Sequence, residues 1–370
     1  MKTKFPATNL EYHISRTALG EAFITASVNS DASEAVEECY ARLAATLAEE
    51  GLAIVHERLF GSLSFKEQAH AARKRALHAS GIDGSGPLTY LEGGPLFGEG
   101  FAGVMIHAVP NEACVRELSG GGTVRGRSWT AGGNIFFMLQ DLTGEAGEVI
   151  RLAESALKEN GADFCDVIRT WFFLDDILSW YGEFNQIRNS LYGEFGIMPG
   201  GSESRLLLPA STGIEGTAVP GSRAALDLIA VTGQGGQSVR QMSNPGQMDA
   251  FKYNSAFSRG AVIECSGGKT VYISGTAAID EQGVSLHSGD AKRQMECTFK
   301  KVRALLAQEG AGLNDIASAT VFLKKPEYAP LFHEVLRELK LNGFPCVVMV
   351  ADVCRDDLLF ELDAVAVIKI

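Results

Sequence analysis

The stretch TVYISGTAAID, residues 270–280, decides the fold, because the pattern that it begins recurs along the chain. Apolar residues alternate along it, as in a β-strand with one buried face. Residues 288–312 follow, with apolar positions at helical spacing and a glycine at the end. The rest of the unit is predicted as strand, helix, strand and strand at residues 316–325, 327–343, 345–353 and 358–368. The predicted order is therefore β-α-β-α-β-β.

The same order recurs twice, clearly in the middle third of the chain and more weakly in the first. The middle third has predicted strands at 134–142, 167–176, 204–212 and 223–231, and helices at 145–162 and 178–196. The first third has predicted strands at 20–29, 52–62, 86–94 and 101–109, and helices at 32–51 and 64–81.

The pattern predicts an α/β (α+β) fold of three units near residues 14–110, 130–232 and 255–370. Each unit would be a two-layer sandwich, a mixed sheet with two helices on one face. The corresponding domains are residues 1–118, 119–240 and 241–370, and the glycine-rich segment 231–247 is interpreted as a linker.

Composition narrows the classes of function. The 370 residues are 46% hydrophobic and 21% charged, as in globular proteins, and the formal net charge is −12. This charge argues against nonspecific nucleic-acid binding and requires local arginines for any anionic substrate. The seven cysteines and seven histidines form no metal-ligand spacing, so no metal site is expected. Without a signal peptide or an apolar run of membrane-spanning length, we expect a cytoplasmic protein that does not engage a membrane.

The segment ADVCRDDLLFELDAVAVI, residues 351–368, places a thiol and a carboxylate among apolar neighbours. It is interpreted as two short strands joined by a charged turn. Strand alternation puts Glu361 and Asp363 on one face, opposite Phe360 and Leu362. Read from the residues alone, Glu361 could equally face solvent, and Cys354 could be a small buried apolar residue.

Arginine is the side chain that best binds carboxylates, because it donates two parallel hydrogen bonds. An arginine within an apolar strand needs an anion or a carboxylate partner. An internal salt bridge with Asp175, Asp176 or Glu183 is the alternative to a binding role. The candidate binding residues are Arg169, Arg188 and Arg205, with Tyr181 and Tyr192 nearby in the sequence, and Arg259 in the third unit.

The third unit resembles the RidA/YjgF family in VYISGTAAID, LLAQEGAGLNDIASATVFL and FELDAVAV. That family forms trimers of a chorismate-mutase-like fold with sites between subunits. The resemblance implies an intrachain pseudo-trimer here. Its imine-deaminase activity implies an arginine on the penultimate strand and a carboxylate on the last. Glu361 matches the carboxylate, but Cys346 takes the arginine position, whereas Arg205 of the middle unit is matched with Ala225.

Nearly the whole chain resembles the chorismatases, in RTWFFLDDILSWYGEFNQIRNSLYGEFG, PASTGIEG, GFAGVMIHAV, NSAFSRG and ADVCRDDLLFEL. This resemblance implies conversion of chorismate to pyruvate and a hydroxybenzoate without a cofactor. Glu361 matches the catalytic glutamate. Members that form 3-hydroxybenzoate have a cysteine seven residues earlier, where Cys354 stands, whereas dihydrodiol formers have alanine. The resemblance therefore favours 3-hydroxybenzoate. Both a monomeric pseudo-trimer and a trimer of chains stay open.

Two other functions stay open. One is an enamine or imine hydrolase of the RidA type with an altered site. The other is a non-catalytic protein that binds a small metabolite between its units. The sequence leaves the product isomer, the pathway and the roles of the individual arginines open.

Overall fold

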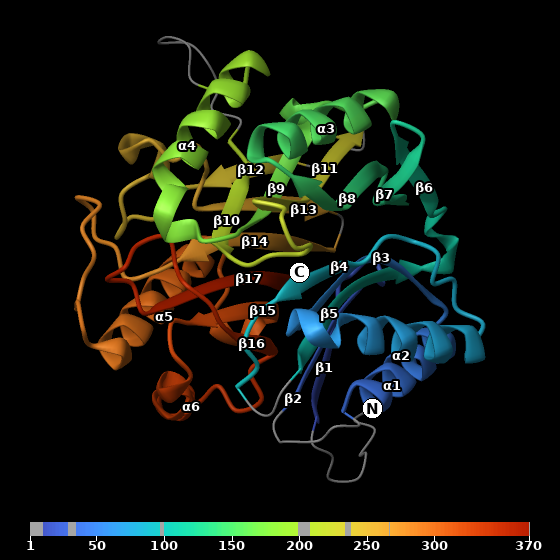
Figure 1. Cartoon of the computed structure of the whole chain (residues 1–370), viewed down its shortest axis with the longest axis horizontal. Helices are drawn as coiled ribbons and strands as arrows, with labels where there is room; N and C mark the ends of the chain where they lie inside the picture. Colours follow the sequence, from blue (N-terminus) through green and yellow to red (C-terminus); the bar gives the residue numbers. More distant parts are fainter. Residues whose placement is uncertain are drawn as a thin grey trace.

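The computed structural model describes residues 10–28, 35–96, 100–198, 208–233, 238–265 and 267–369. These residues form three sheets, each with its own pair of helices, and we name the three parts units 1, 2 and 3 in chain order. Figure 1 shows the helix pairs on the outside of the molecule and the sheets toward its middle. The predicted fusion of three two-layer α/β units is confirmed.

The elements of the units are as follows. Unit 1 contains β1 (Leu10–Arg16), β2 (Ala22–Val28), α1 (Ala35–Glu50), β3 (Leu52–Gly61), α2 (Lys66–Ala79), β4 (Thr89–Glu92) and β5 (Phe101–Pro110). Unit 2 contains β6 (Arg116–Gly120), β7 (Thr123–Ala131), β8 (Asn134–Gly144), α3 (Ala146–Glu159), β9 (Val167–Leu174), α4 (Ile177–Glu194), β10 (Ala210–Glu215) and β11 (Ala224–Gly233). Unit 3 contains β12 (Ser238–Met242), β13 (Gly260–Cys265), β14 (Gly268–Thr276), α5 (Ala291–Ala307), β15 (Ile316–Leu323), α6 (Ala329–Glu338), β16 (Cys346–Val350) and β17 (Phe360–Lys369).

The three sheets share one topology, except that the described part of unit 1 has five strands and no counterpart of β6 and β12. Their strand orders are β1-β2-β5-β3-β4, β6-β7-β8-β11-β9-β10 and β12-β13-β14-β17-β15-β16. In each sheet the last two strands of this order are parallel, and the other neighbours are antiparallel. The shared order means that a position in one unit has a structural equivalent in the other two.

The pairing register identifies these equivalents. Phe60, Phe173 and Phe322 pair with Gly103, Ala225 and Glu361, respectively. Two residues away, Arg58, Trp171 and Thr320 pair with Met105, Asp227 and Asp363. The central strand of each unit therefore carries a different pair of side chains at the same place, and only unit 3 has two carboxylates there.

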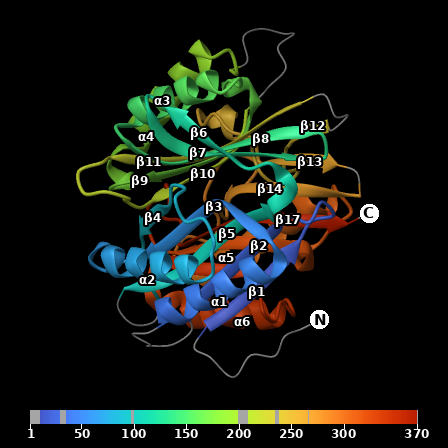
Figure 2. The same cartoon turned by 90° about the vertical axis from the view of Figure 1, so that its right-hand side faces the viewer.

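Apolar packing explains why the units join. Each unit has a core cluster between its sheet and its helices, and a further cluster contains residues from all three sheets. Because strand side chains alternate in direction, one face of each sheet meets its own helices and the other faces the middle of the molecule. Figure 2 shows the three sheets together between the outer helices from a second direction.

Several expectations need correction. The segment 231–247 is not only a linker, because it contains β12, which pairs with β13 at the edge of the unit 3 sheet. Residues 351–359 contain no strand, so Cys354 lies in a loop before β17. The sequence does not predict β1, β6, β7, β12 and β13 as separate elements. Of these, β1, β6 and β12 are edge strands, which carry weak alternation, whereas β7 and β13 lie inside their sheets. The domain boundaries at residues 119 and 241 stay a prediction; β6 begins at Arg116 and β12 at Ser238.

Phe299 of α5 provides a test of the unit 3 core. It is 0% exposed, and its ring packs near those of Phe332, Phe344 and Phe360. We expect Phe299→Ala to lower the free energy of unfolding by about 3–5 kcal/mol, because it removes buried surface and leaves a cavity. Denaturant unfolding measures this. The control Ile135→Ala, at a side chain that is 45% exposed, should change it by less than about 0.5 kcal/mol. Similar effects of the two substitutions would contradict the packing described here.

Candidate active site

A cavity of about 220 Å³ lies between units 2 and 3, and we call it the unit 2–3 cleft. Unit 2 contributes side chains from α4 and β10. Unit 3 contributes residues from the segment before β13, from β14, from the loop before β17 and from β17 itself. The cleft therefore exists only because the two units pack together, with a backbone bridge between Ala210 and Ser258 beside it.

Glu361 is the carboxyl group of this cleft. It lies on β17, it is 4% exposed, and it lines the cavity together with residues of unit 2. Burial and the neighbouring charge of Asp363 raise its pKa to about 8, although Arg259 and Arg169 act in the opposite direction. A carboxyl group with this pKa is largely protonated at neutral pH. Glu361 can therefore donate a proton, which an ordinary glutamate cannot do there.

Asp363, two residues further along β17, has a different environment. Its Oδ2 accepts a hydrogen bond of 2.8 Å from Thr212 Oγ1, and Arg169 Nη2 lies 3.3 Å from the same oxygen. Arg169 also donates to Thr212 Oγ1 and lies over the ring of Trp171. The two carboxyl groups on this face of β17 thus have different surroundings: Arg169 forms its ion pair with Asp363 and not with Glu361.

Gly275 makes room for the Glu361 side chain. It lies on β14 where the pairing with β17 is irregular, between Ile273 and Thr276. A Cβ atom at this position would lie 2.2 Å from Glu361 Oε1 and 3.1 Å from its Cδ. Any other residue would therefore displace the carboxyl group, so the position depends on glycine.

Three arginines line the cleft. Arg188 and Arg259 are buried, whereas Arg355 is half-buried. Arg188 Nη2 donates to Asn185 Oδ1 at 2.6 Å, and Arg259 Nη2 donates to the Tyr253 hydroxyl at 2.7 Å. In the described ranges none of the three forms an ion pair with a carboxylate. With Glu361 protonated, the cleft carries excess positive charge and suits an anion with more than one negative group.

Other polar groups complete the wall. The ring of Tyr181 lies against Gly213, and burial raises the pKa of its hydroxyl. Burial and the charge of Glu361 raise the pKa of the Cys354 thiol to about 12, so Cys354 is not a thiolate nucleophile. Gln247 is 4% exposed, and neither its amide oxygen nor its nitrogen has a partner within the described structure. Such a buried amide is available to a ligand hydroxyl.

The cleft brings together five of the predicted site residues, Glu361, Cys354, Tyr181, Arg188 and Arg259. Arg169 does not line it but bonds to Asp363, rather than to Asp175, Asp176 or Glu183, which were considered as its partners. Arg205 lies outside the described residues. Tyr192 is buried against Phe164 and is not part of the wall.

Sequence reasoning missed Gln247, Tyr253, Phe257 and Arg355. The first three lie in an irregular segment that has no strand or helix periodicity. Arg355 directly follows Cys354. Because the sequence assigns it to a charged turn, it is not expected to line the cleft. Two quoted motifs could have found three of them. NSAFSRG contains Phe257 and directly follows Tyr253, and ADVCRDDLLFEL contains Arg355.

The other two unit boundaries lack the acid. Gly103 and Ala225 stand at the positions equivalent to Glu361. Thr212 pairs with Trp171, and Val347 pairs with the equivalent residue Thr320. The residues just before them, Ser211 in unit 2 and Cys346 in unit 3, are therefore also equivalent. An arginine–carboxylate pair of the imine-deaminase type is therefore not formed by these positions.

The described residues form neither a metal-binding cluster nor a membrane-crossing helix. They contain no group of three or more histidine, cysteine, aspartate and glutamate side chains arranged to hold a metal ion. None of their helices combines the length and the apolar character that crossing a membrane requires.

Comparisons with known proteins identify the family. The family described as Endoribonuclease L-PSP matches residues 248–368. A RutC family protein of Pyrococcus abyssi is 32% identical over 101 residues, which cover 27% of this chain and 79% of that protein. This chain belongs to the RutC family. The match lies in a part of the chain about the size of one unit, so the RutC-family fold occurs here within a longer chain.

The longer matches extend beyond one RutC-family unit. A 3-hydroxybenzoate synthase of Streptomyces hygroscopicus is 26% identical over 250 residues, 60% of this chain and 70% of that protein. A solved structure described as a chorismatase covers 85% of this chain and 93% of its own, with a TM-score of 0.62 and 17% identity, which shows a shared fold. These matches support the predicted resemblance, a chorismatase family built on a RidA-like fold.

The raised pKa of Glu361 can be measured directly. In protein labelled with ¹³C at glutamate carboxyl carbons, we expect one resonance to titrate near pH 8 and to be absent from Glu361→Gln. Exposed glutamates, which titrate near about 4.3, serve as internal controls. Gly275→Ala should move the Glu361 resonance, because the new methyl group displaces the carboxyl group. A Glu361 resonance that titrates with the exposed glutamates would show that the cleft does not hold a neutral acid.

Proposed function

We propose that this chain is a chorismatase that converts chorismate to pyruvate and a hydroxybenzoate. The observation that carries the proposal is the buried acid Glu361, which faces an arginine-lined cleft between units 2 and 3. Chorismate is a dianion with an enolpyruvyl ether, so it needs both cations and a proton donor. The likeness to 3-hydroxybenzoate synthase and to the chorismatase fold supports this substrate.

In the proposed mechanism, protonated Glu361 donates its proton to the enol methylene carbon. The carbon next to the ether oxygen then becomes an oxocarbenium-like centre, which weakens the bond between the ring and the pyruvyl group. Water adds to this centre, and the resulting hemiketal breaks its bond to the ether oxygen, which releases pyruvate and a ring diol and returns one proton to Glu361. The ring then either retains this diol or loses one molecule of water and becomes aromatic. The aromatic outcome consumes no net water, whereas the diol outcome consumes one molecule.

Proton donation requires the neutral form of Glu361. Because its pKa is raised to about 8, this form is present below that pH and is lost as the pH rises through it. The ion pair of Asp363 with Arg169 sustains the negative charge beside Glu361 that keeps its proton in place. Arg169 thus acts in the proposal as a positioning residue, not as a direct ligand of the substrate.

Substrate binding falls to the cations of the cleft. Arg188 and Arg259 are held by Asn185, by Tyr253 and by the backbone of Met248, so their guanidinium groups are already oriented. Preorganised arginines lose little side-chain entropy on binding a carboxylate. Gln247 and Tyr181 would bind the ring hydroxyl. The cleft is complete within one chain, and the proposal needs no second copy of the protein.

The product is proposed to be 3-hydroxybenzoate. Cys354 lines the same cleft as Glu361, and its raised pKa keeps the thiol neutral. A neutral, weakly polar group beside the ring affects how the intermediate collapses without forming a bond to it. The likeness to the 3-hydroxybenzoate synthase of Streptomyces hygroscopicus supports the aromatic product.

The first test is turnover of chorismate by Glu361→Gln. Because glutamine has no proton to donate as an acid, we expect kcat to fall by about 10²–10⁴-fold. Pyruvate release, coupled to lactate dehydrogenase, measures the rate, and chromatography identifies the aromatic product. The matched control Glu327→Gln removes an exposed carboxylate of the same unit and should leave the rate unchanged.

The alternatives predict other results of this assay. A RidA-type imine hydrolase would release ammonia from an imine and no pyruvate from chorismate. A metabolite-binding protein would bind chorismate without turnover. Unchanged turnover in Glu361→Gln would remove the acid from the mechanism, and absence of pyruvate with the wild-type protein would overturn the proposal.

The second test concerns the product. With Cys354→Ala we expect pyruvate release to continue while the aromatic fraction of the product decreases and the dihydrodiol increases. Chromatography of both products measures the ratio, with Cys297→Ala on α5 as a control outside the cleft. An unchanged ratio would contradict a product-determining role for Cys354.

A further inference from the structure

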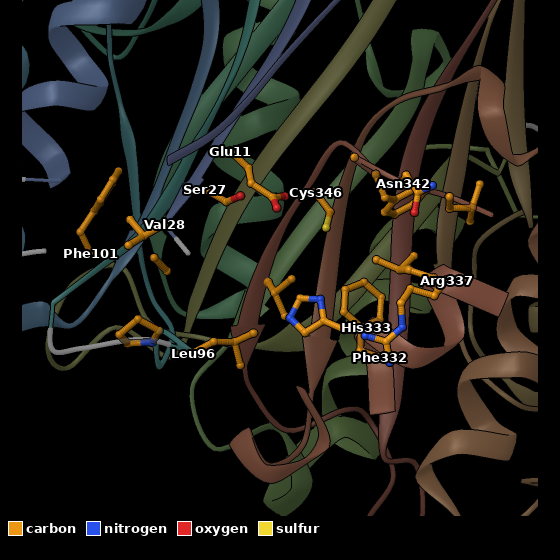
Figure 3. Close-up of a pocket in the computed structure, with 17 residues that line it drawn as sticks. Glu11, Ser27, Val28, Leu96, Phe101, Phe332, His333, Arg337, Asn342 and Cys346 are labelled. Atoms are coloured by element: carbon orange, nitrogen blue, oxygen red, sulfur yellow. The ribbon is translucent and has the colours of Figure 1, made fainter. Parts of the chain in front are cut away.

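A second cavity, of about 280 Å³, lies between units 3 and 1, and we call it the unit 3–1 cleft. It is lined by α6 and β16 of unit 3 and by β1, β2 and the start of β5 of unit 1. Relative to its two units, it occupies the place that the unit 2–3 cleft occupies, with α6 instead of α4 and β16 instead of β10. Figure 3 shows its lining side chains.

The unit 3–1 cleft has no acid at the position equivalent to Glu361. Gly103 occupies the position of Glu361, and a Cβ atom there would lie 2.7 Å from the carbonyl oxygen of Ala26 and 2.9 Å from Val347. A carboxylate side chain therefore does not fit. The cleft has a cavity of similar size but lacks the buried acid that the proposed reaction needs.

The chemistry of its walls differs from that of the unit 2–3 cleft. Phe101, Phe332, Leu336 and Phe344 give it apolar surfaces suited to a flat ring. Only a few polar groups interrupt these surfaces, and they come from opposite units. Because the polar groups of unit 1 and unit 3 lie on opposite sides of the cavity, they would contact opposite ends of a ligand.

The polar groups have opposite charge. His333 and Arg337 lie on the exposed side of α6, whereas Glu11 lies on β1 of unit 1. In Figure 3, Cys346 lies between Glu11 and Arg337. Burial and the charge of Glu11 raise the pKa of the Cys346 thiol, which indicates that the Glu11 carboxylate is close to the cavity.

From this arrangement we propose that the unit 3–1 cleft is a non-catalytic binding site for a hydroxylated aromatic monocarboxylate. Its ring lies between the apolar walls, its carboxylate meets Arg337 and His333, and its hydroxyl group donates to Glu11. A second carboxylate on the ligand would face Glu11 and be repelled, so the site excludes dianions. A monohydroxybenzoate, the class to which the proposed product belongs, has these features, but the binding site itself does not depend on the proposed function.

Binding of 3-hydroxybenzoate, benzoate and chorismate to the whole protein tests this site. Isothermal titration gives affinity and the number of sites, and saturation-transfer NMR reports the ring contacts. We expect Leu336→Trp, which fills the cleft, to remove one 3-hydroxybenzoate site. We expect Arg337→Gln, at an exposed position, to weaken that site by about tenfold, because it removes a charged hydrogen-bond donor.

Glu11→Gln tests the orientation of the ligand. The wild-type site should prefer 3-hydroxybenzoate over benzoate by about tenfold, and this variant should reduce the preference, because a charged acceptor is replaced by a neutral amide. Chorismate should not compete for this site, since it is a dianion.

The outcomes separate this inference from the proposed function. Loss of one site in Leu336→Trp together with weakened binding in Arg337→Gln supports the inference, whether or not chorismate is turned over. Binding that neither variant changes, or equal binding of chorismate at the same site, overturns it. Absence of pyruvate release overturns only the reaction proposed for the unit 2–3 cleft.

Discussion

The ion pair between Arg169 of β9 and Asp363 of β17 joins unit 2 to unit 3 beside the candidate site. Arg169 is fully buried, and burial lowers its pKa to about 10, while the charge of Asp363 acts to raise it. Removing either partner would leave a buried charge without its counterion, which proteins tolerate poorly. With Arg169 engaged by Asp363, Glu361 lies in the same buried region with no cation of its own at ion-pair distance in the described structure. One carboxyl group thus forms an ion pair, and its charge helps to raise the pKa of its neighbour Glu361.

Equivalent contacts connect the other unit boundaries, with different chemistry. Thr212 donates to Asp363 between units 2 and 3, and Thr89 donates to Asp227 at 2.7 Å between units 1 and 2. His56 stands at the place of Arg169 and lies 2.9 Å from Asp227. Between units 3 and 1, Val347 occupies the threonine position and Met105 the aspartate position. The fold thus repeats three times, but the acid and its supporting ion pair occur together once.

The sequence predicted the units well because their central strands and helices have strong periodicity. It predicted the edge strands poorly, since β6 and β12 are short and pair on only one side. For the site, the resemblance located Glu361 and Cys354, and residue type pointed to Arg188 and Arg259. The sequence could not show that Arg169 forms an ion pair with Asp363, because Asp363 is far away in the chain and belongs to another unit. Gln247 was out of reach for the same reason, as its unpaired amide is visible only once the units are packed.

The covalent connection of the units has a consequence for how such a protein can change. In a trimer of identical subunits, a substitution near the axis appears three times at once. Asp227 and Asp363 are both buried and both act electrostatically on Arg58, so they lie near one another, and Met105 takes the third equivalent position. Three identical subunits with the unit 3 sequence would bury six carboxyl groups around these positions. When one gene encodes all three units, a substitution changes only one boundary. One cleft can therefore specialise without any change in the other two.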